Sequence, residues 1–149
     1  MASQLHLLRT ALWVEVRISL MLSNNGKSVL LCDDDQSVLD AVASVLEESG
    51  YEVYTSHNHI EFLSRMQQCS PSVIILDIRM PERDGFWLAE GLQALGQQIP
   101  IIFLTGYDSM IYRLYAPFVG SIAYLTKPVD TKLLLAKVEK ALNRSPVTT

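Results

Sequence analysis

Short apolar runs, each followed by a segment with helical spacing, constrain this sequence more than any other feature. The clearest run is Val73–Leu76, four branched apolar residues followed directly by Asp77. A run so short and so uniformly apolar predicts a strand buried on both faces, as in parallel sheets. Five short runs, four of them apolar and one, Tyr51–Thr55, of aromatic and β-branched residues, alternate with stretches whose apolar residues recur at helical spacing. This alternation predicts an α/β fold with a doubly wound, parallel five-stranded sheet between two layers of helices, a three-layer sandwich.

The order of the strands in the sheet does not follow from this pattern. We expect strands at residues 29–32, 51–55, 73–76, 100–104 and 122–125, with a helix after each. The helix after Thr105 should be short or irregular, because Pro117 falls near its end and Gly120 follows.

The composition is that of an ordinary globular domain, with 49% hydrophobic and 19% charged residues over a length that suits one domain. We expect this domain at residues 28–143, preceded by an appendage of unknown role at 1–27 and followed by a tail at 144–149. A net charge of −4 without a basic cluster argues against nucleic-acid binding. Cys32 and Cys69 form no Cys-x-x-Cys motif, so we expect free thiols and a cytoplasmic protein.

The appendage carries two conflicting patterns. Its apolar residues alternate from Leu12 to Leu22, which favours an extra strand, whereas the leucines before them fit helical spacing. Glu15 and Arg17 interrupt the apolar stretch, so we expect neither a membrane span nor a signal peptide. A partner surface, a swapped strand and a wrongly assigned start codon are all compatible with this segment.

Polar groups follow four of the five expected strands. They are Asp33, Asp34 and Asp35 after the first, Asp77 after the third, Thr105 after the fourth and Lys127 after the fifth. A parallel sheet brings these groups to one edge, where ligands bind in such folds. Crowded carboxylates raise one another's pKa, and a hard divalent cation such as Mg2+ relieves their repulsion. A hydroxyl and an ammonium group nearby would complement a phosphoryl group.

These residues, in this order, resemble the receiver domain of the two-component response regulators over roughly residues 28–142. The motifs that carry the resemblance are Asp33-Asp34, Asp77-Ile78-Arg79-Met80-Pro81 with Gly85, Thr105-Gly106 and Tyr124-Leu125-Thr126-Lys127-Pro128. The resemblance implies a flavodoxin-like (βα)5 fold and a phosphorylation-dependent signalling switch rather than an enzyme.

The resemblance also implies a role for each site residue. Asp77 would accept a phosphoryl group from a sensor histidine kinase or a phosphotransfer protein, with Thr105 and Lys127 as the other catalytic residues. Ile78 and Gly106 would contact the phosphoryl group.

A metal site and a switch pair are implied in the same way. Mg2+ would be held by Asp34, Asp77 and the backbone carbonyl of Arg79, with Asp33 acting through water. Thr105 and Tyr124 would switch together on phosphorylation. The Lys127–Pro128 peptide bond would be cis and would aim the lysine into the site. Asp35 is expected to cap a helix outside the metal site.

The fourth helix, the fifth strand and the last helix would form the output face, which changes to control a downstream partner or an effector domain absent from this chain. That face is unusually aromatic, with Tyr112, Tyr115 and Phe118 beside Pro117. This puts the usual dimer geometry in doubt, although a homodimer remains open.

Two other functions fit parts of the sequence. Asp33 to Ser37 formally match the Asp-x-Asp-x-Ser motif of haloacid dehalogenase-type phosphatases, with Asp33 as nucleophile and Asp35 as acid/base. That family needs an acidic pair downstream of its lysine, which this chain lacks, and it leaves the motif at Asp77 unexplained. A binding module that is never phosphorylated is the third alternative.

Overall fold

A computed structural model describes residues 26–143 and six positions of the appendage, which are Gln4, Leu7, Ala11, Val14, Glu15 and Ile18. All six are helical and exposed. The predicted strand is therefore wrong at Val14, Glu15 and Ile18. Val14 and Ile18 alternate with polar positions but are also four residues apart, which places them on one face of a helix. The rest of that prediction, and the tail at 144–149, lie outside the described residues.

The described domain alternates strands and helices as predicted. Its elements are β1 (Ser28–Cys32), α2 (Gln36–Glu48), β2 (Glu52–Ser56), α3 (His59–Gln68), β3 (Val73–Leu76), α4 (Gly85–Ala94), β4 (Ile101–Thr105), α5 (Met110–Tyr115), the 3-10 turn η1 (Ala116–Val119), β5 (Ser121–Thr126) and α6 (Thr131–Leu142). The five strands form one parallel sheet in the order β2-β1-β3-β4-β5. The predicted doubly wound α/β fold is confirmed. Among the described residues, no helix has the length and apolar character needed to cross a bilayer.

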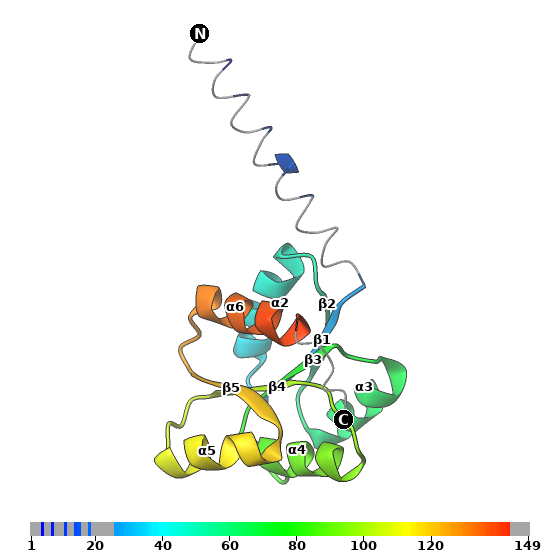
Figure 1. The fold of residues 1–149 in the computed structure, drawn as a ribbon, viewed down its shortest axis with the longest axis vertical. Coiled ribbons are helices and arrows are strands. Elements are labelled where there is room, and N and C mark those ends of the chain that lie inside the picture. The colour runs from blue at the N-terminus through cyan, green and yellow to red at the C-terminus, as the bar shows by residue number, and fades with distance from the viewer. Residues whose placement is uncertain are drawn as a thin grey trace.

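Helices cover both faces of the sheet (Figure 1), with α2 and α6 on one side and α3, α4 and α5 on the other. Neighbouring residues of each strand point to opposite faces, so Leu30 packs in one core cluster and Leu31 in the other. Both are buried, as the uniformly apolar runs predict.

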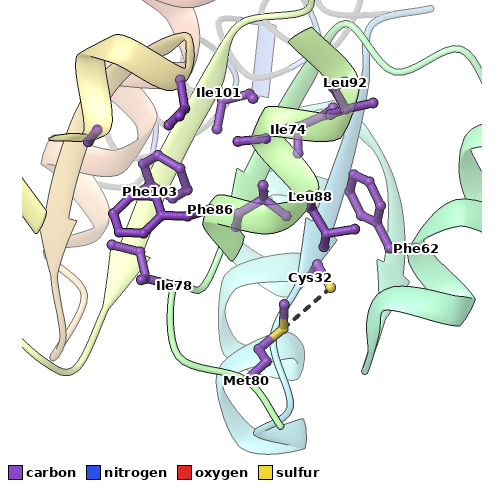
Figure 2. Packing of buried hydrophobic residues seen from close by; sticks show 14 of the residues in the cluster. Cys32, Phe62, Ile74, Ile78, Met80, Phe86, Leu88, Leu92, Ile101 and Phe103 are labelled. Atoms are coloured by element: carbon purple, nitrogen blue, oxygen red, sulfur yellow. Dashed lines mark hydrogen bonds between the residues drawn. The ribbon is translucent and has the colours of Figure 1, made fainter. Parts of the chain in front are cut away.

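The core beneath α3 and α4 contains Cys32, whose Sγ lies 3.6 Å from Met80 Sδ (Figure 2). Burial raises the pKa of this thiol to about 12, which keeps it protonated. Cys32 and Cys69 are both free, as predicted.

Asp or Asn residues begin four of the five α-helices described within residues 26–143. Asp35, Asn58, Asp84 and Asp130 each accept a hydrogen bond from a backbone N–H of the first turn. The exception is α5, whose N-cap Ser109 makes no side-chain capping bond. This helix has only six residues and passes into η1, which ends at Gly120 with φ of 88°. The prediction of a short, irregular fourth helix is confirmed.

Candidate functional site

The parallel ladder positions the site by continuing one residue beyond the strands. The N–H of Asp33 donates to Ser56 O (3.1 Å), that of Asp77 to Cys32 O (2.9 Å) and that of Lys127 to Thr105 O (2.8 Å). These bonds fix three functional residues at the carboxyl edge of the sheet. The edge therefore brings together residues that are up to 94 positions apart in sequence, from Asp33 to Lys127.

Lys127 bridges two buried carboxylates. Its Nζ lies 2.6 Å from Asp33 Oδ2 and 3.2 Å from Asp77 Oδ2. Asp33 is 1% exposed and Asp77 is 5% exposed, so both charges are withdrawn from water. A single ammonium group thus serves two acids, and Asp34 adds a third carboxylate nearby.

This imbalance of charge perturbs the titration of the site. Burial, together with the charge of Asp33, raises the pKa of Asp77 from 3.8 to about 6, against the opposing effect of Lys127. Burial acts to lower the pKa of Lys127, but its hydrogen bond to Asp33 and the charges of Asp77 and Asp33 outweigh that effect and raise it. At neutral pH the site holds an ionised Asp77 beside a charged lysine.

The loop that follows Asp77 is held close to this residue by Gly85. The N–H of Gly85 donates to Ile78 O at 2.9 Å, and the N–H of Arg79 donates to Asp77 Oδ1 at 3.3 Å. A Cβ at position 85 would lie only 2.2 Å from Asp77 O. Glycine is required here because the start of α4 touches the backbone of Asp77. The side chain of Ile78 is buried in the core, and its backbone carbonyl accepts the hydrogen bond from Gly85.

Carboxylate oxygens of Asp33, Asp34 and Asp77 lie within 4.8 Å of one another. This set of hard oxygen donors suits a divalent cation such as Mg2+. Asp35 is directed elsewhere, because its Oδ1 accepts from the N–H and hydroxyl of Ser37 at 2.9 and 2.6 Å. Its predicted role as a helix cap is confirmed. A phosphatase that used Asp35 as acid/base would need this carboxylate in the cluster.

Thr105 is fully buried and bonds to the backbone two residues on. The N–H of Tyr107 donates to Thr105 Oγ1 at 3.2 Å, and Tyr124 donates its hydroxyl proton to Tyr107 O at 3.3 Å. Gly106 lies beside the stem of Lys127, whose Cδ would be 3.7 Å from a Cβ at that position. The Lys127–Pro128 bond is cis, as predicted.

One contact at the rim of the site is absent from the sequence-based prediction. The guanidinium of Arg79 lies over the ring of Tyr107, 4.3 Å from its centroid. The two residues belong to the loops after β3 and β4, which are adjacent strands. In the sequence, Arg79 follows Asp77 by two residues and Tyr107 follows Thr105 by two, which places both near the site. Only the order of the strands shows that the side chains of Arg79 and Tyr107 can meet.

Fold and site together define a doubly wound α/β domain whose carboxyl edge carries an acidic cluster, a lysine and a hydroxyl suited to bind a phosphoryl group and a cation. The sequence model of the response regulator receiver domain matches residues 29–139. The chain belongs to this family.

Relatives and solved structures agree with this assignment. The response regulator protein TmoT of Ectopseudomonas mendocina is 36% identical over 124 residues, which cover 83% of this chain and 56% of TmoT. Response regulator MprA of Mycobacterium avium (strain 104) is 32% identical over 117 residues, 78% of this chain and 51% of MprA. The chain thus spans about half the length of these relatives.

Among solved structures, a CheY-like response regulator receiver domain protein from Methanospirillum hungatei JF-1 has a TM-score of 0.74 at 32% identity, covering 78% of this chain and 94% of that one. Chemotaxis protein CheY4 of Vibrio cholerae has a TM-score of 0.73 at 31% identity, with coverage of 78% and 98%. The chain is a receiver domain of a two-component system, a signalling domain that responds to phosphorylation.

Proposed function

We propose that Asp77 is the phosphoacceptor of this domain and that a sensor histidine kinase or a phosphotransfer protein supplies the phosphoryl group. The observation that carries the proposal is the pair of contacts from Lys127 Nζ to Asp33 and Asp77 at the buried carboxyl edge. Of the two acids, Asp77 opens the loop that Gly85 holds in place. Asp33 also accepts from the N–H of Asp35 at 2.9 Å, which suits a fixed supporting group better than a nucleophile.

In the proposed reaction an oxygen of Asp77 attacks the phosphorus of a phosphohistidine and forms a P–O bond. The P–N bond breaks, and its electron pair returns to the imidazole of the donor. With a pKa of about 6, Asp77 is mostly ionised at neutral pH and is ready to attack. Lys127 would then pair with the phosphoryl oxygens, and Thr105 Oγ and the N–H of Gly106 would donate to them. Ile78 would contact the same group.

The donor set at the edge fits Mg2+. Asp34 and Asp77 would bind it directly with the backbone carbonyl of Arg79, and Asp33 would do so through water. Bound there, Mg2+ would neutralise the negative charge that develops on the transferring oxygens. Phosphotransfer and hydrolysis of Asp77 phosphate would be the domain's only reactions, so we propose a switch rather than an enzyme that turns over a separate substrate.

Phosphorylation would reach the output face through Thr105 and Tyr124. When Thr105 turns toward the phosphoryl group, it gives up its contact with Tyr107, to whose carbonyl Tyr124 is bonded. The face formed by α5, β5 and α6 would then change and control a partner or an effector domain outside this chain, or a homodimer. We assign this role to residues 28–143 of a cytoplasmic protein, with 1–27 as an appendage and 144–149 as a tail.

Acetyl phosphate with Mg2+ tests the acceptor directly. Intact mass spectrometry of the full chain should show an increase of about 80 Da, one phosphoryl group, that peptide mapping assigns to Asp77. Asp77→Asn should abolish this increase. Asp40→Asn, a change at an exposed α2 carboxylate, should retain it. The proposal is wrong if the wild-type mass does not change, or if Asp77→Asn is modified as fully as the wild type.

A further inference from the structure

Tyr107 connects the acceptor loop to α5 through its ring as well as its backbone. One side of the ring meets the Arg79 guanidinium at 4.3 Å, and the ring also meets Tyr112 of α5 in a T-shaped contact at 5.6 Å. Its backbone separately bonds to Thr105 and Tyr124. The residue is 50% exposed, so the ring is positioned by these neighbours rather than by burial in the core.

The contact continues from Tyr112 into the core. Tyr112 packs edge to face on Phe86 at 5.2 Å, and Phe86 packs on Phe103 of β4 at 5.1 Å. Figure 2 shows Phe86 lying against Phe103 within the buried cluster. A row of rings therefore runs from Arg79 at the rim of the phosphorylation site to the centre of the domain, and α5 is attached to it through Tyr112 and through Tyr115, which also packs on Phe86.

Other contacts also hold α5, and they come from exposed side chains. Tyr115 is 39% exposed; its ring packs on Phe86 at 5.0 Å and its hydroxyl donates to Glu90. Arg113 pairs with Asp108 at 2.6 Å and lies over the ring of Tyr124 at 4.8 Å.

None of the six residues of α5 is buried, and Tyr112 is the least exposed of them. Met110, Ile111 and Leu114 are 77%, 75% and 66% exposed. The helix also lacks a side-chain cap at its start. Because α5 buries none of its residues and is held by side-chain contacts at the surface, the loss of one ring contact can lower its local stability.

We propose that the Arg79–Tyr107 contact holds α5 in place in the unphosphorylated domain and that a phosphoryl group on Asp77 releases it by drawing the guanidinium away. This inference rests on the proposed role of Asp77. An arginine forms charge-assisted, bidentate hydrogen bonds with a phosphoryl group, and these are stronger than its attraction to the face of an exposed ring. Arg79 lies two residues past Asp77 in the same loop, so it can exchange one partner for the other. Release of Tyr107 removes one of the two ring contacts of Tyr112, leaving the contact with Phe86, and loosens the helix that carries the exposed apolar residues.

Hydrogen–deuterium exchange of the amides at residues 110–119 tests this in the full chain. Arg79→Met, without phosphorylation, should speed exchange by about two- to fivefold, the effect of losing one exposed cation–ring contact. Beryllofluoride with Mg2+ should speed wild-type exchange by a similar factor and should add no second increase of that size in Arg79→Met. Tyr107→Leu should behave like Arg79→Met, whereas Tyr107→Phe keeps the ring and should behave like the wild type.

Arg83→Met is the matched control. Arg83 lies in the same loop and covers another ring, that of Trp87, at 4.9 Å. Its loss should leave exchange in α5 unchanged. The inference fails if Arg79→Met exchanges as slowly as the wild type, or if Arg83→Met loosens α5 equally.

Intact mass measured on acetyl phosphate-treated samples separates the two proposals. Absence of the increase of about 80 Da refutes the role of Asp77. Normal phosphorylation with no change in α5 exchange refutes only the release step. In either case, the comparison of wild type with Arg79→Met without phosphorylation decides whether the Arg79–Tyr107 contact holds α5.

Discussion

Neutralising Asp77 should stabilise the fold. In Asp77→Asn the amide keeps an oxygen for the N–H of Arg79, which donates to Asp77 Oδ1 at 3.3 Å in the wild type. The substitution removes a carboxylate that is 5% exposed and shares the ammonium of Lys127 with Asp33. We therefore expect the free energy of unfolding at pH 7 to rise, although an ion pair is lost.

The pKa of Asp77 sets the size of the effect. Folding raises this pKa from 3.8 to about 6, so the folded state favours the protonated acid. A difference of one pKa unit corresponds to about 1.4 kcal/mol, which gives a ceiling of about 3 kcal/mol. Asn cannot reproduce every contact of the protonated acid, so we expect a gain of about 1 to 3 kcal/mol. Wild-type stability falls as pH rises from about 4 to about 6, so the advantage of Asp77→Asn grows over this range.

Urea unfolding of the full chain in EDTA, between pH 4 and pH 8, measures this advantage. Asp40→Asn is the control, because its exposed carboxylate on α2 should change stability by no more than about 0.5 kcal/mol. Mg2+ should reduce the advantage of Asp77→Asn, since it binds the wild type more tightly than the variant and therefore stabilises the wild type more. A metal-free Asp77→Asn protein that is less stable than the wild type, or an advantage that does not vary with pH, would refute the electrostatic reasoning.

Three further predictions concern the same edge. Gly85→Ala should cost at least about 1 to 3 kcal/mol in urea unfolding and impair phosphorylation, because its Cβ would lie 2.2 Å from Asp77 O. In the same helix, a Cβ added at Gly91 would have no atom within 4 Å, so Gly91→Ala should not destabilise the protein. Lys127→Met should lower the free energy of unfolding by about 3 kcal/mol without metal, since it leaves the buried carboxylate of Asp33 without its ammonium partner. Mg2+ should restore part of the lost stability, and a variant that Mg2+ does not stabilise would contradict the proposed metal site. Phosphorylation by acetyl phosphate at limiting Mg2+ should slow as pH falls through about 6, because protonated Asp77 does not attack phosphorus. Saturating Mg2+ should move this fall to lower pH, since the cation favours the carboxylate, and a rate at limiting Mg2+ that is flat to pH 5 would contradict the raised pKa of Asp77.

The architecture could be predicted because the three central strands, β1, β3 and β4, read as buried without reference to their neighbours, and all their residues are buried. Val73–Leu76 is uniformly apolar, and all four residues are buried in the structure. The strand order could not be predicted, because parallel strands of similar composition carry no local mark of which neighbour they pair with. The appendage shows the limit of periodicity, since Val14 and Ile18 satisfy both the alternation of a strand and the spacing of a helix.

The chemical groups of the site could be predicted because they directly follow the strands. The strand-end positions of Asp33, Asp77 and Lys127 suffice to place them on one edge of a parallel sheet. Which acid pairs with the lysine depends on side-chain geometry, and the structure shows that both do. The contact between Arg79 and Tyr107 depends on strand order, and for that reason the motifs alone do not reveal it.

The site departs from the rules that the rest of the fold follows, and the departure explains why this edge can respond to a ligand. Buried charges elsewhere in a protein are normally matched, but here two buried carboxylates and a nearby third share one ammonium. A cation would relieve this excess, whereas a phosphoryl group would increase it and compete for Lys127 and Arg79. Because Lys127 touches two strand ends and Arg79 touches the loop before α5, any change of partner at Asp77 alters contacts on several elements. The core clusters on both faces of the sheet do not depend on these charges, so the edge can rearrange while the fold persists.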